Sequence, residues 1–130
     1  MPDPDSCLDR VAETTDVEPV DALFDPVDER LLVLVPSGTA DDVTQSVGAL
    51  QSALGWPVEV VTYAGDAAGL IENALAPATV HNVTVSQSGV AYAEVDREDR
   101  GLAIGNGGTR IRRARLLAER YYGVDDVELT

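Results

Sequence analysis

The sequence predicts an α+β fold made of two consecutive units with the same order of elements. Two observations predict it. Hydrophobic residues alternate between helical and strand spacing, and the succession helix, strand, strand, helix or helix pair, strand occurs twice in 130 residues. With 45% hydrophobic residues, the chain can build a buried core. Each half of about 65 residues is small for independent stability, so we expect the halves to pack together.

The first unit is assigned to residues 1–65. Three kinds of signal predict its elements: a residue that caps a helix, runs of branched apolar residues in the strands, and a glycine with a proline just beyond it at a helix end. In order, they are a helix capped by Ser6, strands over Val17–Phe24 and Leu31–Val35, a helix from Val43 to Leu54 that ends at Gly55, and a strand over Val58–Tyr63.

The second unit is assigned to residues 66–130. A Ser-Gln-Ser-Gly turn joins two strands of alternating pattern, and glycines flank its last helix. In order, the predicted elements are a helix over Asp66–Ala76, strands over Val80–Ser86 and Val90–Asp96, a short helix within Glu98–Gly105, a longer helix over Gly108–Tyr122, and a strand over Val127–Leu129.

The chain has a formal net charge of −14, and all nine of its basic residues are arginine. Such a composition is typical of organisms that keep molar salt in the cytosol. There the Debye length is about 3 Å, so the salt screens the repulsion between closely spaced surface carboxylates. The alternative is an acidic surface that serves only solubility. The absence of lysine favours a halophilic organism.

The positive charge is concentrated in one segment. Between Arg97 and Arg120 the chain has seven arginines and three acids, a net charge of +4, whereas the remaining residues carry −18. A local basic segment in an acidic protein suits a polyanionic ligand. The alternative is a helix whose arginines pair with acids elsewhere in the chain.

A glycine-rich turn, Gly105-Asn106-Gly107-Gly108, lies between the two last predicted helices. Glycines allow close approach of a ligand to the backbone, and the second helix directs unpaired N–H groups and its positive dipole end to the same place. The expected ligand is phosphate. A dinucleotide-binding loop is disfavoured because Arg110 replaces the third glycine and a helix, not a strand, precedes the turn. A Walker loop does not fit because lysine is absent.

The segment "VAYAEVDREDRGLAIGNGGTRIRRARLLAERYYGVDDVEL", together with "ENALAPATVHNVTV" before it, resembles the second KH unit of the archaeal NusA-like transcription factors. The resemblance implies two tandem type II KH units, each helix-strand-strand-helix-helix-strand. It further implies single-stranded RNA binding linked to transcription termination or antitermination. The alternatives are a protein-interaction module that contacts RNA polymerase or other transcription factors, and a ribosome-associated KH protein.

The resemblance also implies the site residues. The clamp for the RNA backbone would be Gly105, Asn106, Gly107 and Gly108. Bases would dock in an apolar cleft lined by Ala103, Ile104 and Ile111. Arg110 and Arg113 are the best candidates for phosphate contact, with Arg112 and Arg115 as weaker ones. The family often has a basic residue where this chain has Asn106, so one phosphate-directed charge is missing.

The first unit departs from this pattern. Counting back from "GWPVEVV" places its loop at Asp41-Asp42-Val43-Thr44, where two carboxylates would repel phosphate. We therefore expect a degenerate KH unit that lacks the Gly-x-x-Gly loop and serves as a packing partner or protein-contact surface. The alternative is a different register, in which Ser37-Gly38 or Gly48 contributes to the loop.

No catalytic constellation is evident in the sequence. His81 lies on a predicted strand without a nucleophile at suitable spacing, Cys7 is expected on an apolar helix face, and Trp56 is expected to pack in the core rather than stack on bases. We expect no enzyme activity, no metal and no cofactor. Because neither a signal peptide nor an apolar membrane span is visible, we expect a cytoplasmic protein with no membrane partner.

Overall fold

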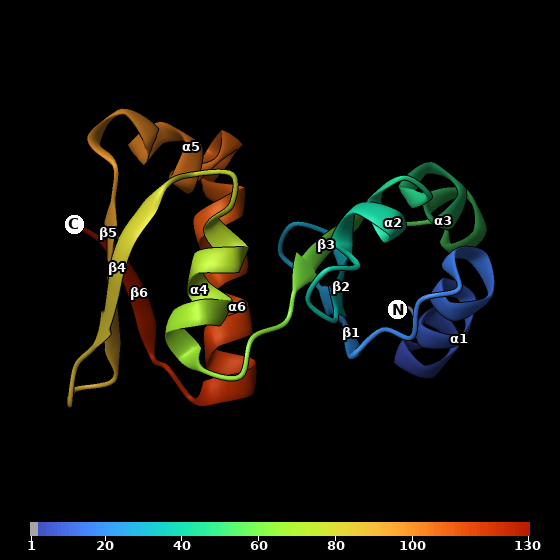
Figure 1. Ribbon diagram of the computed structural model, residues 1–130, viewed down its shortest axis with the longest axis horizontal. Coiled ribbons are helices and arrows are strands. Elements are labelled where there is room, and N and C mark those ends of the chain that lie inside the picture. The colour runs from blue at the N-terminus through green and yellow to red at the C-terminus, as the bar shows by residue number, and fades with distance from the viewer. Residues whose placement is uncertain (1–2) are drawn as a thin grey trace. The chain divides into compact units, whose positions relative to one another are not determined.

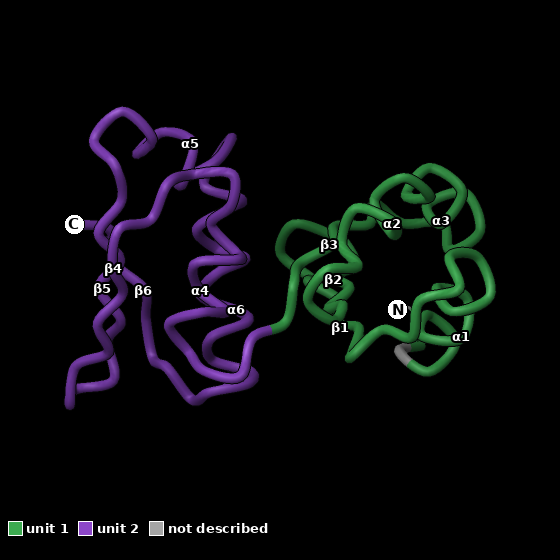
Figure 2. Tube along the Cα trace, in the orientation of Figure 1, with its two compact units in different colours: residues 1–63 green, residues 64–130 purple. Residues whose placement is uncertain are grey.

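The computed structural model describes residues 3–130, and the chain divides into two compact units, Met1–Tyr63 and Ala64–Thr130 (Figures 1 and 2). Each unit follows the order helix, strand, strand, helix, helix, strand, with short 3₁₀ turns added in the second. The predicted α+β fold with two repeats of one topology is confirmed. The division lies two residues before the predicted one, which is between Gly65 and Asp66.

Unit 1 has three helices and a three-stranded sheet. The sheet order is β1-β2-β3, in which β1 and β2 pair antiparallel and β2 and β3 pair parallel. The elements are α1 (Pro4–Thr15), β1 (Asp21–Asp25), β2 (Arg30–Val35), α2 (Ala40–Thr44), α3 (Val47–Leu54) and β3 (Val58–Thr62).

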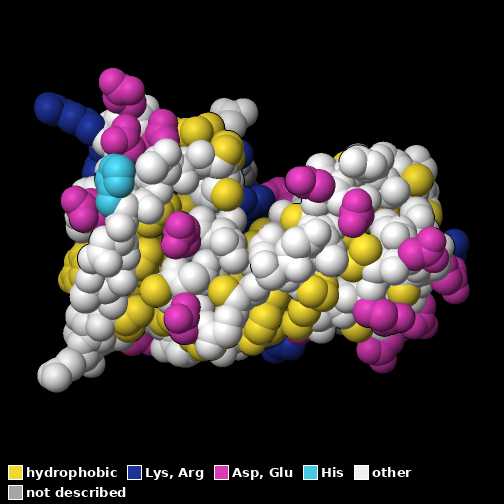
Figure 3. All heavy atoms as spheres, in the orientation of Figure 1, with side chains coloured by type: hydrophobic (Ala, Val, Ile, Leu, Met, Phe, Trp, Pro, Cys, Tyr) yellow, Lys and Arg dark blue, Asp and Glu magenta, His cyan; other side chains and the backbone are white. Residues whose placement is uncertain are grey.

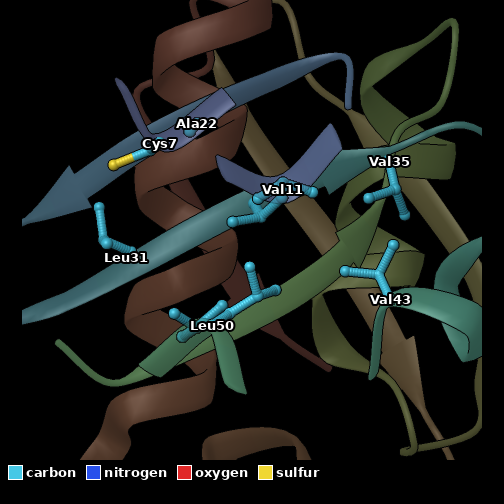
Figure 4. Close-up of a cluster of buried hydrophobic side chains, with 9 residues drawn as sticks. Cys7, Val11, Ala22, Leu31, Val35, Val43 and Leu50 are labelled. Carbon is cyan, nitrogen blue, oxygen red and sulfur yellow. The ribbon is translucent and has the colours of Figure 1, made fainter. Parts of the chain in front are cut away.

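The core of unit 1 lies between its helices and one face of its sheet. Cys7 and Val11 from α1 meet alternate residues of β2, while Leu50 of α3 closes the cluster (Figure 4). Trp56 packs edge-on against Phe24, with ring centroids 4.8 Å apart. Cys7 and Trp56 are therefore packing residues, as predicted.

A buried ion network holds the β1–β2 hairpin of unit 1. Arg30 is 3% exposed; its Nε donates to Asp25 Oδ2 at 2.9 Å and its Nη1 donates to Glu59 Oε2 at 2.7 Å. Burial alone would lower the pKa of this guanidinium, but the hydrogen bonds and charges of Glu59 and Asp25 outweigh it and raise the pKa. Arg30 therefore stays charged and pairs with carboxylates of unit 1.

Unit 2 repeats the topology, with sheet order β4-β5-β6, an antiparallel pair followed by a parallel pair. Its regular elements are α4 (Ala67–Leu75), β4 (Val80–Val85), β5 (Val90–Val95), α5 (Arg100–Ile104), α6 (Thr109–Tyr122) and β6 (Asp126–Leu129). The helices α4 and α6 lie side by side against the sheet (Figure 1). Ala91 and Ala93 of β5 are fully buried, and these small side chains allow the helices to approach closely.

Three predicted elements of unit 1 differ in the structure. The first helix is capped by Asp3 and not by Ser6, which lies inside α1 and donates its hydroxyl to Asp3 Oδ2 at 3.1 Å. The strand expected from Val17 begins only at Asp21, because Pro19 has no N–H to donate and the ladder opens with Val20 N–H to Leu34 O at 2.7 Å. The single helix expected from Val43 to Leu54 is instead two helices, α2 and α3.

No helix within residues 3–130 is long and apolar enough to cross a membrane.

Candidate nucleic-acid interface

The glycine turn connects α5 to α6 at one end of unit 2 (Figure 1). Gly105 follows α5 directly, and Asn106–Gly108 form one 3₁₀ turn before α6. Gly105, Gly107 and Gly108 all have positive φ, of 79°, 65° and 80°. Only glycine takes up this succession of angles without strain, so the sequence Gly-Asn-Gly-Gly determines the shape of the connection.

Each carbonyl in the first three residues of this turn has a donor. Gly105 O accepts from Gly108 N–H at 3.1 Å, and Asn106 O accepts from the N–H of Thr109 and from its Oγ1 at 3.1 Å. Gly107 O accepts from Arg112 Nη1 at 2.8 Å. The oxygens that would repel a phosphate are therefore engaged within unit 2.

The N–H groups of the turn are disposed differently. Among residues 3–130, the structure shows no acceptor for the N–H groups of Asn106 and Gly107. Because C=O and N–H of a trans peptide point in opposite directions, the bond from Thr109 to Asn106 O turns the Gly107 N–H away from α6. Both residues are exposed. The turn thus presents donors, an arrangement that favours an anion.

The glycines differ in what surrounds them. A Cβ on Gly105 would lie 2.7 Å from the backbone N of Arg110, so this residue packs directly against the first turn of α6. A Cβ on Gly107 would meet nothing within 4 Å. Gly105 is therefore needed for packing, whereas Gly107 leaves an open approach to the backbone.

Arg110 lies next to the glycine turn, and its phosphate contact stays a prediction. Its Nη1 donates to Leu102 O, one of the last carbonyls of α5, which have no intrahelical partner. Its remaining donors have no acceptor among residues 3–130. Arg110 is partly exposed on the first turn of α6 and can still reach a phosphate beside the glycines.

Arg113 does not fit the predicted phosphate contact. It is 8% exposed, and its guanidinium donates to Ala74 O of α4 through Nε and Nη2. The prediction was wrong because position 113 faces α4 rather than the glycine turn, which the linear spacing of arginines does not reveal. Arg115, a weaker candidate, pairs with Asp126 Oδ1 at 2.9 Å on β6.

The apolar residues near the turn separate into two groups. Ala103 and Ile111 are 0% and 6% exposed, so most of their surface is withdrawn from a ligand. Ile104 is 40% exposed beside the turn, as a base contact requires. Leu102, which was not among the predicted site residues, is also 40% exposed. Its position on the other side of buried Ala103 is the signal that could have indicated it.

The predicted loop of unit 1 also needs correction. Asp41 and Asp42 lie within α2, because a turn closed by Thr39 Oγ1 on Pro36 O, at 2.6 Å, leaves room for this short helix. The connection between α2 and α3 is Gln45-Ser46, with φ of −60° and −103°. The predicted register was therefore wrong, and the alternative fares no better, because Ser37-Gly38 precede α2 and Gly48 lies within α3. The connection has neither the length nor the positive φ angles of the turn in unit 2.

The remaining candidates do not form a further site. His81 is exposed on β4, and its Nε2 lies 3.2 Å from Asp96 Oδ1. No group of three or more His, Cys, Asp or Glu suited to a metal ion occurs within residues 3–130.

On the visible face of unit 1 the charged side chains are mostly Asp and Glu (Figure 3). Unit 1 has thirteen acids and two arginines, and unit 2 has ten and seven.

Comparison with known proteins points to one family. No protein-family model matches the chain. A probable transcription termination protein NusA of Halobacterium salinarum is 45% identical over 122 residues, which cover 89% of this chain and 86% of that protein. The protein of the same name from Halococcus morrhuae is 43% identical over 134 residues, covering 96% and 95%. The crystal structure of APE1850 superposes with a TM-score of 0.88 at 27% identity, covering 98% and 97% of the two chains.

Proposed function

We propose, since the chain belongs to the NusA-like family of halophilic archaea, that its second unit binds single-stranded RNA. The family places the chain among factors related to transcription termination. The observation that carries the proposal is the turn from Gly105 to Gly108, whose carbonyls are engaged while the N–H groups of Asn106 and Gly107 face solvent.

RNA would be held chiefly through its backbone. A phosphate at the turn would accept hydrogen bonds from the Asn106 and Gly107 N–H groups and from the unused donors of Arg110. Ile104 and Leu102, both exposed on α5, would offer apolar contact to unstacked bases. Single-stranded RNA suits this arrangement because its bases are accessible beside its phosphates. The binding makes and breaks no covalent bond, so we propose a binding protein rather than an enzyme.

Unit 1 suggests a second role for the same chain. Its connection Gln45-Ser46 offers no glycine turn, and its excess of eleven negative charges repels RNA. We propose that this unit contacts a protein of the transcription machinery in the cytoplasm while unit 2 holds the transcript.

Titration of a fluorescent single-stranded RNA pool in molar potassium chloride tests the RNA-binding proposal. The Asn106→Asp/Gly107→Asp variant places two carboxylates at the open donors and should lose RNA affinity by at least about tenfold, because phosphate is repelled and its donors are covered. A matched control, Gln87→Asp/Ser88→Asp, adds the same charge to the exposed β4–β5 turn and should bind like the native chain.

Two results would contradict the proposal. If the turn variant and its control both bind as tightly as the native chain, RNA is held elsewhere. If the native chain does not bind RNA at any salt concentration, the protein-contact role becomes the leading function of both units.

A further inference from the structure

Four arginines of α6 share one property: each donates to a backbone carbonyl of another segment of unit 2. The pairs are Arg110 with Leu102 O in α5, Arg112 with Gly107 O in the glycine turn, Arg113 with Ala74 O in α4, and Arg115 with Val127 O in β6. The first role of these arginines is therefore to hold the segments of unit 2 together, and attraction of a polyanion is secondary. Arg112 braces the proposed RNA site itself.

Arg112 and the glycine turn fit each other closely. Its Nη1 lies 2.8 Å from Gly107 O, and a Cβ on Gly108 would lie 2.8 Å from the same nitrogen. Glycine at position 108 thus leaves the space in which the guanidinium lies. The same peptide group is held at its other end, because Gly108 N–H donates to Gly105 O at 3.1 Å.

We infer that Arg112 is a positioning residue for the anion-binding turn and not itself a phosphate contact. By holding the Gly107 carbonyl, it keeps that oxygen away from an incoming phosphate and fixes the turn with its open N–H groups outward. Without this bond the Gly107–Gly108 peptide is held only by its Gly108 N–H, and the flanking glycines add few steric restraints. The inference rests on the proposed RNA binding and adds to it the residue that shapes the site.

Salt dependence distinguishes a positioning arginine from a phosphate-contacting one. Each phosphate neutralised on a single strand contributes about 0.7 to the slope of log affinity against log salt concentration. Arg112→Met should weaken RNA binding by about tenfold, the loss typical of one hydrogen bond, and leave the slope unchanged. Arg110→Met should weaken binding and reduce the slope by about 0.7. Arg120→Met, at the far end of α6, is the matched control and should change neither.

Amide hydrogen exchange without RNA provides the independent readout. Arg112→Met should accelerate exchange of the Gly108 N–H, because the peptide it belongs to loses one of its two hydrogen bonds, while Arg120→Met should not. Arg112→Lys, which keeps a donor and the charge, should restore part of the protection.

The outcomes separate the two proposals. If Arg112→Met reduces the salt slope as Arg110→Met does, Arg112 is a phosphate contact and the inference is overturned. Unchanged exchange at Gly108 in Arg112→Met also overturns it. If the native chain binds no RNA but exchange at Gly108 accelerates as expected, the proposed function fails while the positioning of the turn by Arg112 stands.

Discussion

The guanidinium of Arg113 donates to the carbonyl of Ala74 through Nε at 3.0 Å and through Nη2 at 2.7 Å. Ala74 lies in the last turn of α4, where carbonyls have no intrahelical donor and a positive charge is favourable. One arginine of α6 thus caps α4 and joins the two helices that cover the sheet of unit 2. A side chain that the linear pattern assigns to RNA instead stabilises the fold.

Arg113→Met should lower the free energy of unfolding of unit 2 by about 2 kcal/mol, since hydrogen bonds from a charged donor are lost and the Ala74 carbonyl stays buried. Arg113→Lys should recover only part of this loss, because an ammonium cannot present two parallel donors. Denaturant titration at molar salt measures both. Equal stability of Arg113→Met and the exposed-site control Arg120→Met would contradict the capping role.

Gly105→Ala should destabilise unit 2 more than Gly107→Ala. Alanine at position 105 takes φ 79° with ψ 171°, a region open essentially to glycine, and its Cβ would collide with the Arg110 backbone, for a cost of about 1–3 kcal/mol or more. Alanine at position 107 has open space and takes a left-handed conformation that costs about 1 kcal/mol. Thermal unfolding compares the two. A larger loss in Gly107→Ala would refute the close packing of Gly105 on α6.

Asp41→Asn/Asp42→Asn should leave RNA affinity unchanged within about twofold, because both residues lie on α2 of unit 1 and not at a phosphate site. Stability should fall slightly, by about 0.3–1 kcal/mol, since carboxylates favour the positive N-terminal end of a helix. Affinity titration and thermal unfolding measure the two effects. An RNA affinity about tenfold higher in the variant would mean that these carboxylates do face the bound strand.

Cys7 should react slowly with a thiol reagent in the native chain. The thiol is 1% exposed, and burial, aided by the charge of Asp3, raises its pKa, so the reactive thiolate is scarce. Because the unfolded chain ionises first as pH rises, this group also makes unit 1 less stable above about pH 8.5. Absorbance of a released chromophore, before and after denaturation, measures reactivity. Rapid stoichiometric reaction of the native chain would contradict the burial of Cys7.

Local sequence patterns predicted most of the fold because helices and strands here obey their own periodicities. Leu70 and Ile71 mark the buried face of α4 as the pattern requires, and Gly55 and Gly123 end their helices in the left-handed conformation. The division between α2 and α3 could not be predicted in the same way. It lies at Gln45-Ser46, where the chain has no glycine or proline to mark the end of a helix.

The candidate site was predictable only in part. The glycines could be found because a positive φ demands a particular residue type, whereas the arginines could not be sorted by role. Arg110, Arg112 and Arg113 are close in sequence but face α5, the glycine turn and α4. Which carbonyl each meets depends on the tertiary packing of α6.

Amide chemical shifts of the labelled chain during titration with a single-stranded RNA test directly whether the glycine turn binds the RNA backbone. The N–H resonances of Asn106 and Gly107 should move most, toward the values of hydrogen-bonded amides, while the Gln45 and Ser46 resonances of unit 1 should stay in place. If RNA binds and the Asn106 and Gly107 resonances do not move, the anion-binding role of the glycine turn is contradicted.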